Sequence, residues 1–144
     1  MRNGFTLLEL VLVLGIVTIV SAGVLVSLRG SDRRALENAS LTLQADLRYA
    51  QRRAIMEGRR YGIVFELANN RYRIVLDSPR QTIRTVYFRE GIELIDVTGP
   101  QLMFLPRGTA SSGFSIMLSN GTYSQELTAT VSGGRVRIFD MVRT

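Results

Sequence analysis

The sequence predicts an α+β protein in which a long N-terminal helix packs against a C-terminal antiparallel β domain. Three observations lead to this prediction. Residues 5–28 form an almost uncharged apolar run, and residues 31–57 repeat apolar side chains at helical spacing. From residue 61 onward, short alternating runs are separated by turn residues, which is the pattern of strands. A chain of 144 residues is long enough for one modest domain and one additional element.

The first element, residues 5–28, carries a single charge, that of Glu9. A helix of this length rises roughly 36 Å, which is enough to cross the hydrocarbon core of a membrane. Apolar residues continue to Leu28 without a polar cleavage region, which favours a retained transmembrane helix over a cleaved secretory signal. A carboxylate in such a segment costs a few kcal/mol unless it is paired or lies near the interface. Glu9 therefore either reaches the lipid headgroups or pairs with a cation of another subunit.

The second element, residues 29–58, is predicted to continue the helix with one apolar face, and Gly58 is a natural C-terminal cap. Arg48 and Arg52 fall roughly opposite this face and Arg53 lies on its flank, which favours a solvated surface over a ligand site. The apolar stripe recurs at spacings of three and four and consists of Leu36, Ala39, Leu43, Leu47, Ala50 and Ala54.

The third element, residues 59–144, is predicted to be a β-rich globular domain whose apolar side chains cover the helix stripe and make one core. Asn69 and Asn70 tolerate positive φ angles and are expected to form the turn of the first hairpin. Strands are expected at residues 61–67, 71–77, 83–89, 92–96, 101–105, 114–118, 126–131 and 135–139.

The composition excludes several classes of function. The chain has no Cys, hence no disulfide, thiolate metal site or cysteine nucleophile, and no His, the usual general base and metal ligand. Glu90 and Glu93 are explained by a turn between strands, and the loop 108–113 lacks the Lys of a phosphate-binding loop. We therefore expect no enzyme, no cofactor and no metal. A net charge of +6 permits contact with nucleic acid or anionic lipid without requiring either.

The N-terminal residues Met1-Arg2-Asn3-Gly4, followed by Phe5-Thr6-Leu7-Leu8-Glu9-Leu10, resemble the type III signal of the type IV pilin and pseudopilin superfamily. This resemblance implies that residues 1–4 are a leader peptide, which the inner-membrane prepilin peptidase removes by cutting between Gly4 and Phe5. It also implies N-methylation of Phe5. Glu9 then corresponds to the glutamate that pairs with a terminal amine in the growing filament and sets the axial register.

The C-terminal part resembles the GspH/FimT group of minor pseudopilins and minor pilins. Phe104-Leu105-Pro106-Arg107-Gly108 is similar to the F-x-P-x-G element of that group, and Gly134-Arg135-Val136-Arg137 is similar to its closing G-R-x-R strand. The resemblance implies a two-sheet β domain. It further implies a structural subunit at or near the tip of a type II secretion pseudopilus or a type IV pilus, with other pilin subunits and secreted substrates as partners.

The resemblance and the charge distribution disagree about membrane orientation. The resemblance implies a single-pass protein of the bacterial inner membrane, with an extracytoplasmic globular domain that enters a periplasm-spanning or surface filament. Only Arg2 precedes the apolar run, whereas Arg29, Arg33 and Arg34 follow it. The positive-inside rule alone therefore predicts that the C-terminal part is cytoplasmic.

A second function of a different class is DNA binding by a minor pilin during natural transformation, which some members of the FimT branch carry out with arginines of the G-R-x-R region. Arg135 and Arg137 lie two residues apart and so share one face of the predicted strand. They are candidates for contacts to phosphates, each of which adds to the salt dependence of binding. The competing interpretation is an edge strand protected from aggregation by its charges.

Overall fold

The computed structural model describes the backbone of residues 6–131 and 133–144 and, except in residues 22–30, their side chains. The predicted leader 1–4, the cleavage site between Gly4 and Phe5, and the methylation of Phe5 lie outside the described residues. The chain divides into two compact units, residues 1–34 and residues 35–144. The longest element is helix α1 (Leu7–Glu57), whose residues are shared between these two units.

In the first unit, the described apolar side chains of α1 are exposed on every side of the helix. Leu7 is 82% exposed, and each residue from Leu10 to Leu14 is also exposed, so that a full turn presents apolar surface. A helix that is apolar all round requires an apolar environment on all of its sides. Among the described residues, no helix combines the length and the apolar character that a membrane crossing requires.

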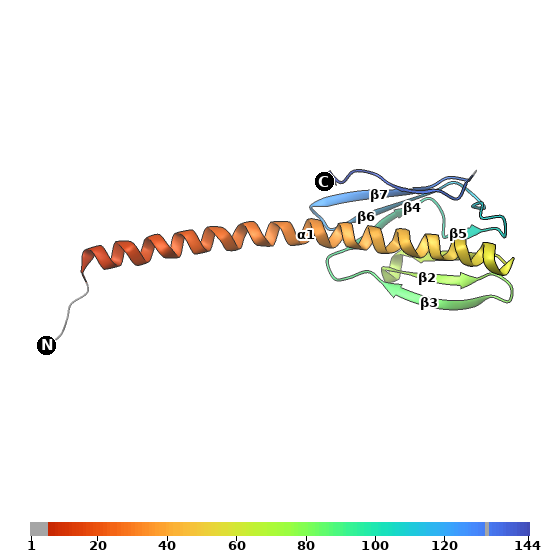
Figure 1. Ribbon diagram of the computed structural model, residues 1–144, viewed down its shortest axis with the longest axis horizontal. Coiled ribbons are helices and arrows are strands. Elements are labelled where there is room, and N and C mark those ends of the chain that lie inside the picture. Colours follow the sequence, from red (N-terminus) through yellow and green to blue (C-terminus); the bar gives the residue numbers. More distant parts are fainter. Residues whose placement is uncertain (1–5, 132) are drawn as a thin grey trace. The chain divides into compact units, whose positions relative to one another are not determined.

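In the second unit, α1 buries one face against the β domain (Figure 1). The helix ends at Glu57, and Gly58 adopts a left-handed conformation with φ 62°, as expected for a glycine cap. The predicted apolar stripe is confirmed: Leu36, Leu43, Leu47, Ala50 and Ala54 are buried, and Ala39 packs against the same core.

The first sheet contains four antiparallel strands in the order β3-β2-β1-β5. The hairpin between β1 and β2 closes through a short 3₁₀ turn (Leu67–Asn69) and Asn70, whose φ of 46° confirms the predicted positive-φ turn. Val64, Val75 and Met103 form a small cluster of their own. The strand bounds are β1 (Tyr61–Glu66), β2 (Arg71–Leu76), β3 (Gln81–Tyr87) and β5 (Gln101–Phe104).

The second sheet is also antiparallel, in the order β4-β6-β7-β8, with β9 pairing along β7 as well. Burial alternates along β7, as expected for a strand with one face on the core. The strand bounds are β4 (Glu93–Val97), β6 (Phe114–Ser119), β7 (Tyr123–Ala129), β8 (Val136–Ile138) and β9 (Val142–Arg143).

The α+β prediction with two antiparallel sheets is confirmed, whereas several strand bounds were wrong. Strand β7 begins at Tyr123 instead of residue 126, because the polar residue Gln125 is buried and donates a hydrogen bond from Nε2 to Phe139 O (3.1 Å). Strand β8 covers only residues 136–138, because Arg135 closes the preceding turn by accepting a backbone hydrogen bond from Thr130 N. Strand β9 was not predicted.

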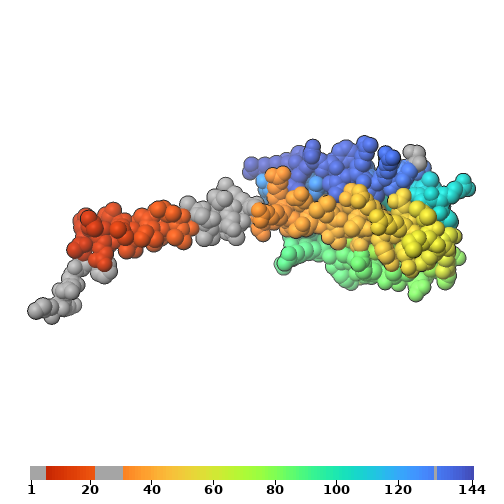
Figure 2. Space-filling model, in the orientation of Figure 1, coloured from red at the N-terminus to blue at the C-terminus, as the bar shows by residue number. Residues whose placement is uncertain are grey.

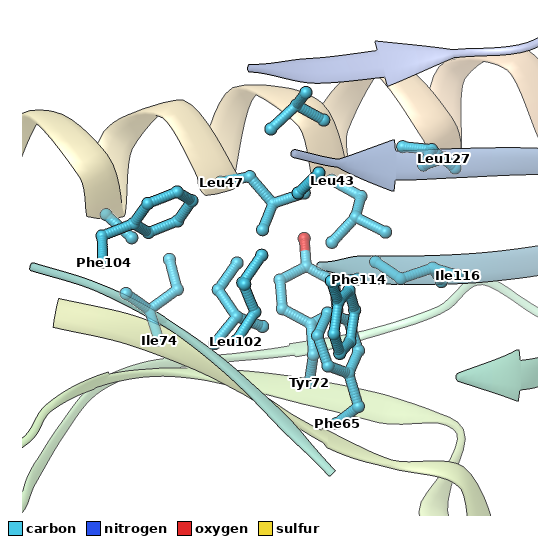
Figure 3. Packing of buried hydrophobic residues seen from close by; sticks show 14 of the residues in the cluster. Leu43, Leu47, Phe65, Tyr72, Ile74, Leu102, Phe104, Phe114, Ile116 and Leu127 are labelled. Carbon is cyan, nitrogen blue, oxygen red and sulfur yellow. The ribbon is translucent and has the colours of Figure 1, made fainter. Parts of the chain in front are cut away.

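The core lies between the two sheets and is capped by the apolar stripe of α1. Figure 3 shows Leu43 and Leu47 of α1 above side chains from β2, β5 and the second sheet. The rings of Phe65 in β1 and Phe114 in β6 stack with centroids 5.2 Å apart and so join the two sheets directly. Fully burying a large apolar side chain contributes about 1.5–3 kcal/mol, which makes this shared core the main source of stability in the second unit.

Candidate functional site

A groove lies where α1 meets the C-terminal residues of the second sheet. In Figure 2 the exposed face of α1 forms a band that is bordered by the C-terminal residues on one side and by β2 and β3 on the other. The groove has a volume of about 390 Å³. We call it the arginine groove; it is lined by Arg48, Gln51 and Arg52 of α1 and by Gly133, Gly134, Arg135, Val136 and Arg137.

Two glutamines of α1 hold the walls of the arginine groove together. Gln44 Nε2 donates a hydrogen bond to Val136 O (3.3 Å), which fixes β8 against the helix. Gln51 Nε2 donates to Gly108 O (2.6 Å) and to Gly133 O (3.3 Å). Arg48 lies four residues after Gln44 and three before Gln51. The three side chains therefore share one face of α1. The glutamines thus fix the backbone of the C-terminal wall opposite Arg48.

The backbone at Gly134 requires a glycine for two reasons. Its φ of 57° lies in the left-handed region, which side chains disfavour. A Cβ atom there would overlap Gly108 O and the Gln51 side chain. Gly108 also has a positive φ, and a Cβ atom on it would lie 2.8 Å from Ile55 Cδ1. The glycines of both C-terminal motifs therefore meet at Gln51, which explains their presence by close packing and backbone conformation.

The four guanidinium groups of the groove form no ion pair with an acid among the described residues. All four of these arginines are exposed, and in the part of the chain that the structure describes no carboxylate lies within ion-pair distance of Arg48, Arg52, Arg135 or Arg137. The lining of the groove contains no Asp or Glu. Uncompensated guanidinium groups of this kind bind carboxylates and phosphates through paired N–H donors. The arrangement is therefore suited to an anionic ligand.

The predicted arginine pair lines the same groove as two arginines of α1. Arg135 and Arg137 are exposed on either side of buried Val136, so they share one face. Arg48 and Arg52 are solvent-exposed, as the sequence indicated, but they also line the same groove as the C-terminal pair. The sequence did not predict this convergence, because α1 and β8 are separated by most of the chain.

Glu9 lies in the first turn of α1, next to a capping residue. The Thr6 Oγ1 atom accepts a hydrogen bond from the Glu9 backbone N–H (3.3 Å). Threonine followed three residues later by glutamate is the sequence of a capping box, and a carboxylate there also faces the positive end of the helix dipole. Thr6 therefore caps the first turn of α1, and Glu9 stands at the position that a capping box assigns to an acidic residue.

A second polar cluster ties α1 to the first sheet, and the sequence analysis missed it. Asp46 is 6% exposed, accepts a hydrogen bond from Tyr72 Oη at its Oδ2 atom (2.7 Å), and pairs with the Arg84 guanidinium through Oδ1. Burial, and then the hydrogen bond to Asp46, raise the pKa of the Tyr72 hydroxyl well above its ordinary value, so it remains a donor. Asp46 directly precedes Leu47 of the apolar stripe. An aspartate at this position on the helix could have indicated a buried carboxylate that needs polar partners.

The long helix, with one stripe packed between two antiparallel sheets, defines a pilin-like protein. Residues 39–134 match the family described as type II transport protein GspH, and residues 1–25 match the prokaryotic N-terminal methylation motif. The chain therefore belongs to the GspH family of minor pseudopilins and minor pilins. Comparison with curated proteins finds no matching sequence.

Two solved structures have the same fold. The minor pseudopilin EpsH from the type 2 secretion system of Vibrio cholerae is 19% identical with a TM-score of 0.62, over 72% of this chain and 95% of that chain. The type IV minor pilin FimU of Pseudomonas aeruginosa is 21% identical with a TM-score of 0.63, over 76% of this chain and 92% of that chain. These likenesses confirm the predicted pilin-like fold class, and the match to the GspH family confirms the predicted subgroup.

Proposed function

We propose that this protein is a minor structural subunit of a type II secretion pseudopilus or a type IV pilus, located at or near the filament tip. The observation that carries this proposal is the combination, in one chain, of the N-terminal methylation motif with a GspH domain. The apolar helix anchors the subunit in the inner membrane as a single span of residues 5–28, and the domain of residues 59–144 is extracytoplasmic. Assembly with other pilin subunits then transfers the helix from lipid to a bundle of similar helices.

Processing at the N-terminus precedes assembly in this proposal. The prepilin peptidase cuts between Gly4 and Phe5, which leaves 144 − 4 = 140 residues, and Phe5 is then N-methylated. The intact mass of the protein from its native membrane tests this directly. We expect loss of residues 1–4 and gain of one methyl group in cells that contain the peptidase, and the full-length mass in cells that lack it.

A matched variant makes the mass measurement specific. Gly4→Leu places a bulky side chain at the proposed cleavage site and is expected to leave the chain uncut and unmethylated. An uncut wild-type chain in peptidase-competent cells would contradict the proposal. A Gly4→Leu chain that is still cut after residue 4 would show that the small residue does not define the site.

Glu9 is proposed to pair with the terminal amine of a neighbouring subunit. Pairing the carboxylate with the amine is favourable in an apolar environment, because each ionised group alone would be costly there. Glu9→Gln separates this role from helix capping, since glutamine also suits a capping box but carries no charge. We expect normal amounts of the variant in the membrane and a several-fold lower amount in purified filaments. Equal incorporation of wild type and variant would leave capping as the only role of Glu9.

Binding of nucleic acid is a second candidate function, favoured by the four exposed arginines of the groove, which form no ion pair within the described part of the chain. In this candidate function, Arg135 and Arg137 contact phosphates of DNA during natural transformation. The slope of log K against log salt is negative, and each lost phosphate contact reduces its magnitude by about 0.9 for duplex DNA. The variant Arg135→Ala plus Arg137→Ala is therefore expected to lose about 1.8 of this slope. Unchanged DNA binding by this variant would remove the second candidate.

A further inference from the structure

We propose that Arg48 and Arg52 of α1 form the second wall of a nucleic-acid site, so that the phosphate backbone lies across α1 and is not held by the C-terminal strand alone. This inference rests on the second candidate function above and deepens it. Spacing along the chain does not connect these two arginines with the C-terminal pair. Their common position in one groove provides that connection.

The surface around the arginine groove is continuous in both directions. On the strand side, a neighbouring hollow is lined by Thr130, Gly133, Arg135 and Arg137 and shares three of these residues with the groove. On the helix side, another hollow shares Arg48 and Arg52 with the groove and includes Leu41 and Tyr49. The three hollows form one elongated surface, which we call the arginine track. Its basic residues are Arg48, Arg52, Arg135 and Arg137.

The arginine track is supported by fixed backbone. Gln44 binds the carbonyl of Val136, which lies between the two C-terminal arginines in sequence, and Gln51 binds the carbonyl of Gly133. The separation between Arg48 on the helix and the Arg135 backbone is therefore set by hydrogen bonds within the protein. A backbone that is already held in place loses less conformational freedom when an anion binds, which favours tighter binding.

An extended phosphodiester fits this track better than a lipid headgroup or an acidic protein does. A lipid surface or a protein partner requires exposed apolar residues beside the charges. Within the arginine groove the lining side chains are polar or basic except Val136, which is buried, and the exposed hydrophobic residues of the track, Leu41 and Tyr49, lie together at its helix end. At the helix end of the track, the ring of Tyr49 is 40% exposed, and the Arg53 guanidinium lies over it with Cζ 5.9 Å from the ring centroid. Repeated cations along an elongated surface match the repeated phosphates of nucleic acid.

The test measures binding of duplex DNA to the full-length chain in uncharged detergent micelles as salt is varied. If each of the four arginines contacts one phosphate, the wild-type affinity falls roughly 150-fold between 50 and 200 mM salt. The variant Arg48→Ala plus Arg52→Ala retains two contacts, and its affinity is expected to fall only about 12-fold over the same range. Its salt slope should match that of the variant Arg135→Ala plus Arg137→Ala.

Two control variants separate the site from general effects of charge. Arg80→Ala plus Arg89→Ala removes the same net charge from exposed positions outside the track and is expected to keep the wild-type slope. Arg48→Lys plus Arg52→Lys preserves both charges and is expected to restore most of the slope, since a lysine also neutralises a phosphate. Thermal unfolding followed by circular dichroism verifies that each variant remains folded.

The outcomes distinguish the inference from the functions on which it rests. In one outcome, the Arg48→Ala plus Arg52→Ala variant keeps the wild-type salt slope, while the Arg135→Ala plus Arg137→Ala variant has a slope of smaller magnitude. This outcome would overturn the inference and leave the second candidate function intact. Absence of DNA binding by the wild type would overturn both. Equal affinity for anionic vesicles or for polyglutamate at the same salt would overturn the assignment to nucleic acid. The proposal of a filament subunit is tested separately by the intact mass.

Discussion

Replacing Tyr72 by phenylalanine tests whether the buried hydrogen bond to Asp46 stabilises the domain. Tyr72 is 1% exposed, and its ring packs against Phe65 and Phe88 with centroid distances of 6.1 and 5.4 Å. Phenylalanine preserves this packing and removes only the hydroxyl. The Oδ2 atom of Asp46 then loses its donor at 2.7 Å while the carboxylate remains buried.

The expected cost follows from the charge on the acceptor. A hydrogen bond to a charged group contributes about 1.5–3 kcal/mol, so we expect the free energy of unfolding to fall by roughly 2 kcal/mol. For a domain of this size, 1 kcal/mol corresponds to about 4 °C in Tm, which predicts a decrease of roughly 8 °C. The assay is thermal unfolding of the full-length chain in uncharged detergent, followed by near-ultraviolet circular dichroism.

Tyr87→Phe is the matched control. Tyr87 is 64% exposed, and its hydroxyl accepts a hydrogen bond from Arg71 Nη1 (2.9 Å) at the surface, where water replaces a lost partner. This substitution is expected to change stability by less than about 0.5 kcal/mol. If Tyr72→Phe cost no more than Tyr87→Phe, the Asp46 carboxylate would have to be hydrated in the folded protein, and the reasoning from burial would be refuted.

Three further predictions concern the groove, acid stability and the core. Gly134→Ala is expected to destabilise the domain by roughly 2 kcal/mol or more, because it combines a left-handed backbone with steric overlap. Gly121→Ala, with φ 80° and open space at Cβ, is expected to cost about half as much in the same thermal assay. Hydrogen bonds from Arg71 and then Asn69 lower the pKa of Glu66 below its ordinary value of 4.5, so its stabilising contribution is complete above that pH and is lost as pH falls through the folded pKa. Glu66→Gln should therefore flatten the loss of Tm below pH 4.5. Leu47→Ala, at a position 1% exposed, is expected to cost about 2–5 kcal/mol in the same assay.

The elements that could be predicted from sequence are those that bury one face against the core, because their apolar residues then repeat at a regular spacing. The stripe from Leu36 to Ala54 identifies the buried face of α1, and the alternation in β6 identifies that strand nearly to the residue. Prediction was poorer where polar side chains lie inside a strand. Gln125 is 8% exposed because its amide has a backbone partner, and a polarity pattern alone reads such a residue as loop.

The buried carboxylate of Asp46 shows a different limit. A helix pattern indicates that Asp46 faces inward, but an inward aspartate is tolerated only when partners satisfy it. Its partners Tyr72 and Arg84 come from β2 and β3, and their arrival at the same point depends on the register between those strands. That register is a tertiary property, since the pairing shifts between Ile74 and Val75.

The arginines of the groove show what a helical pattern predicts about Arg48 and Arg52 and what it leaves out. The pattern assigned them to the face opposite the apolar stripe, which is correct, and solvent is the usual neighbour of such a face. The turn before β8 lies opposite these arginines. Gly134 and Gln51 allow this turn to approach the helix closely. Solvated arginines commonly acquire an acidic neighbour, as Arg53 does with Glu57 four residues later. At four-residue spacing, Arg48 has Gln44 and Arg52 on its two sides and no acid. Among the described residues, Arg48 and Arg52 therefore differ from Arg53 in two ways: no ion pair is formed with an acid, and a tethered C-terminal wall lies opposite them.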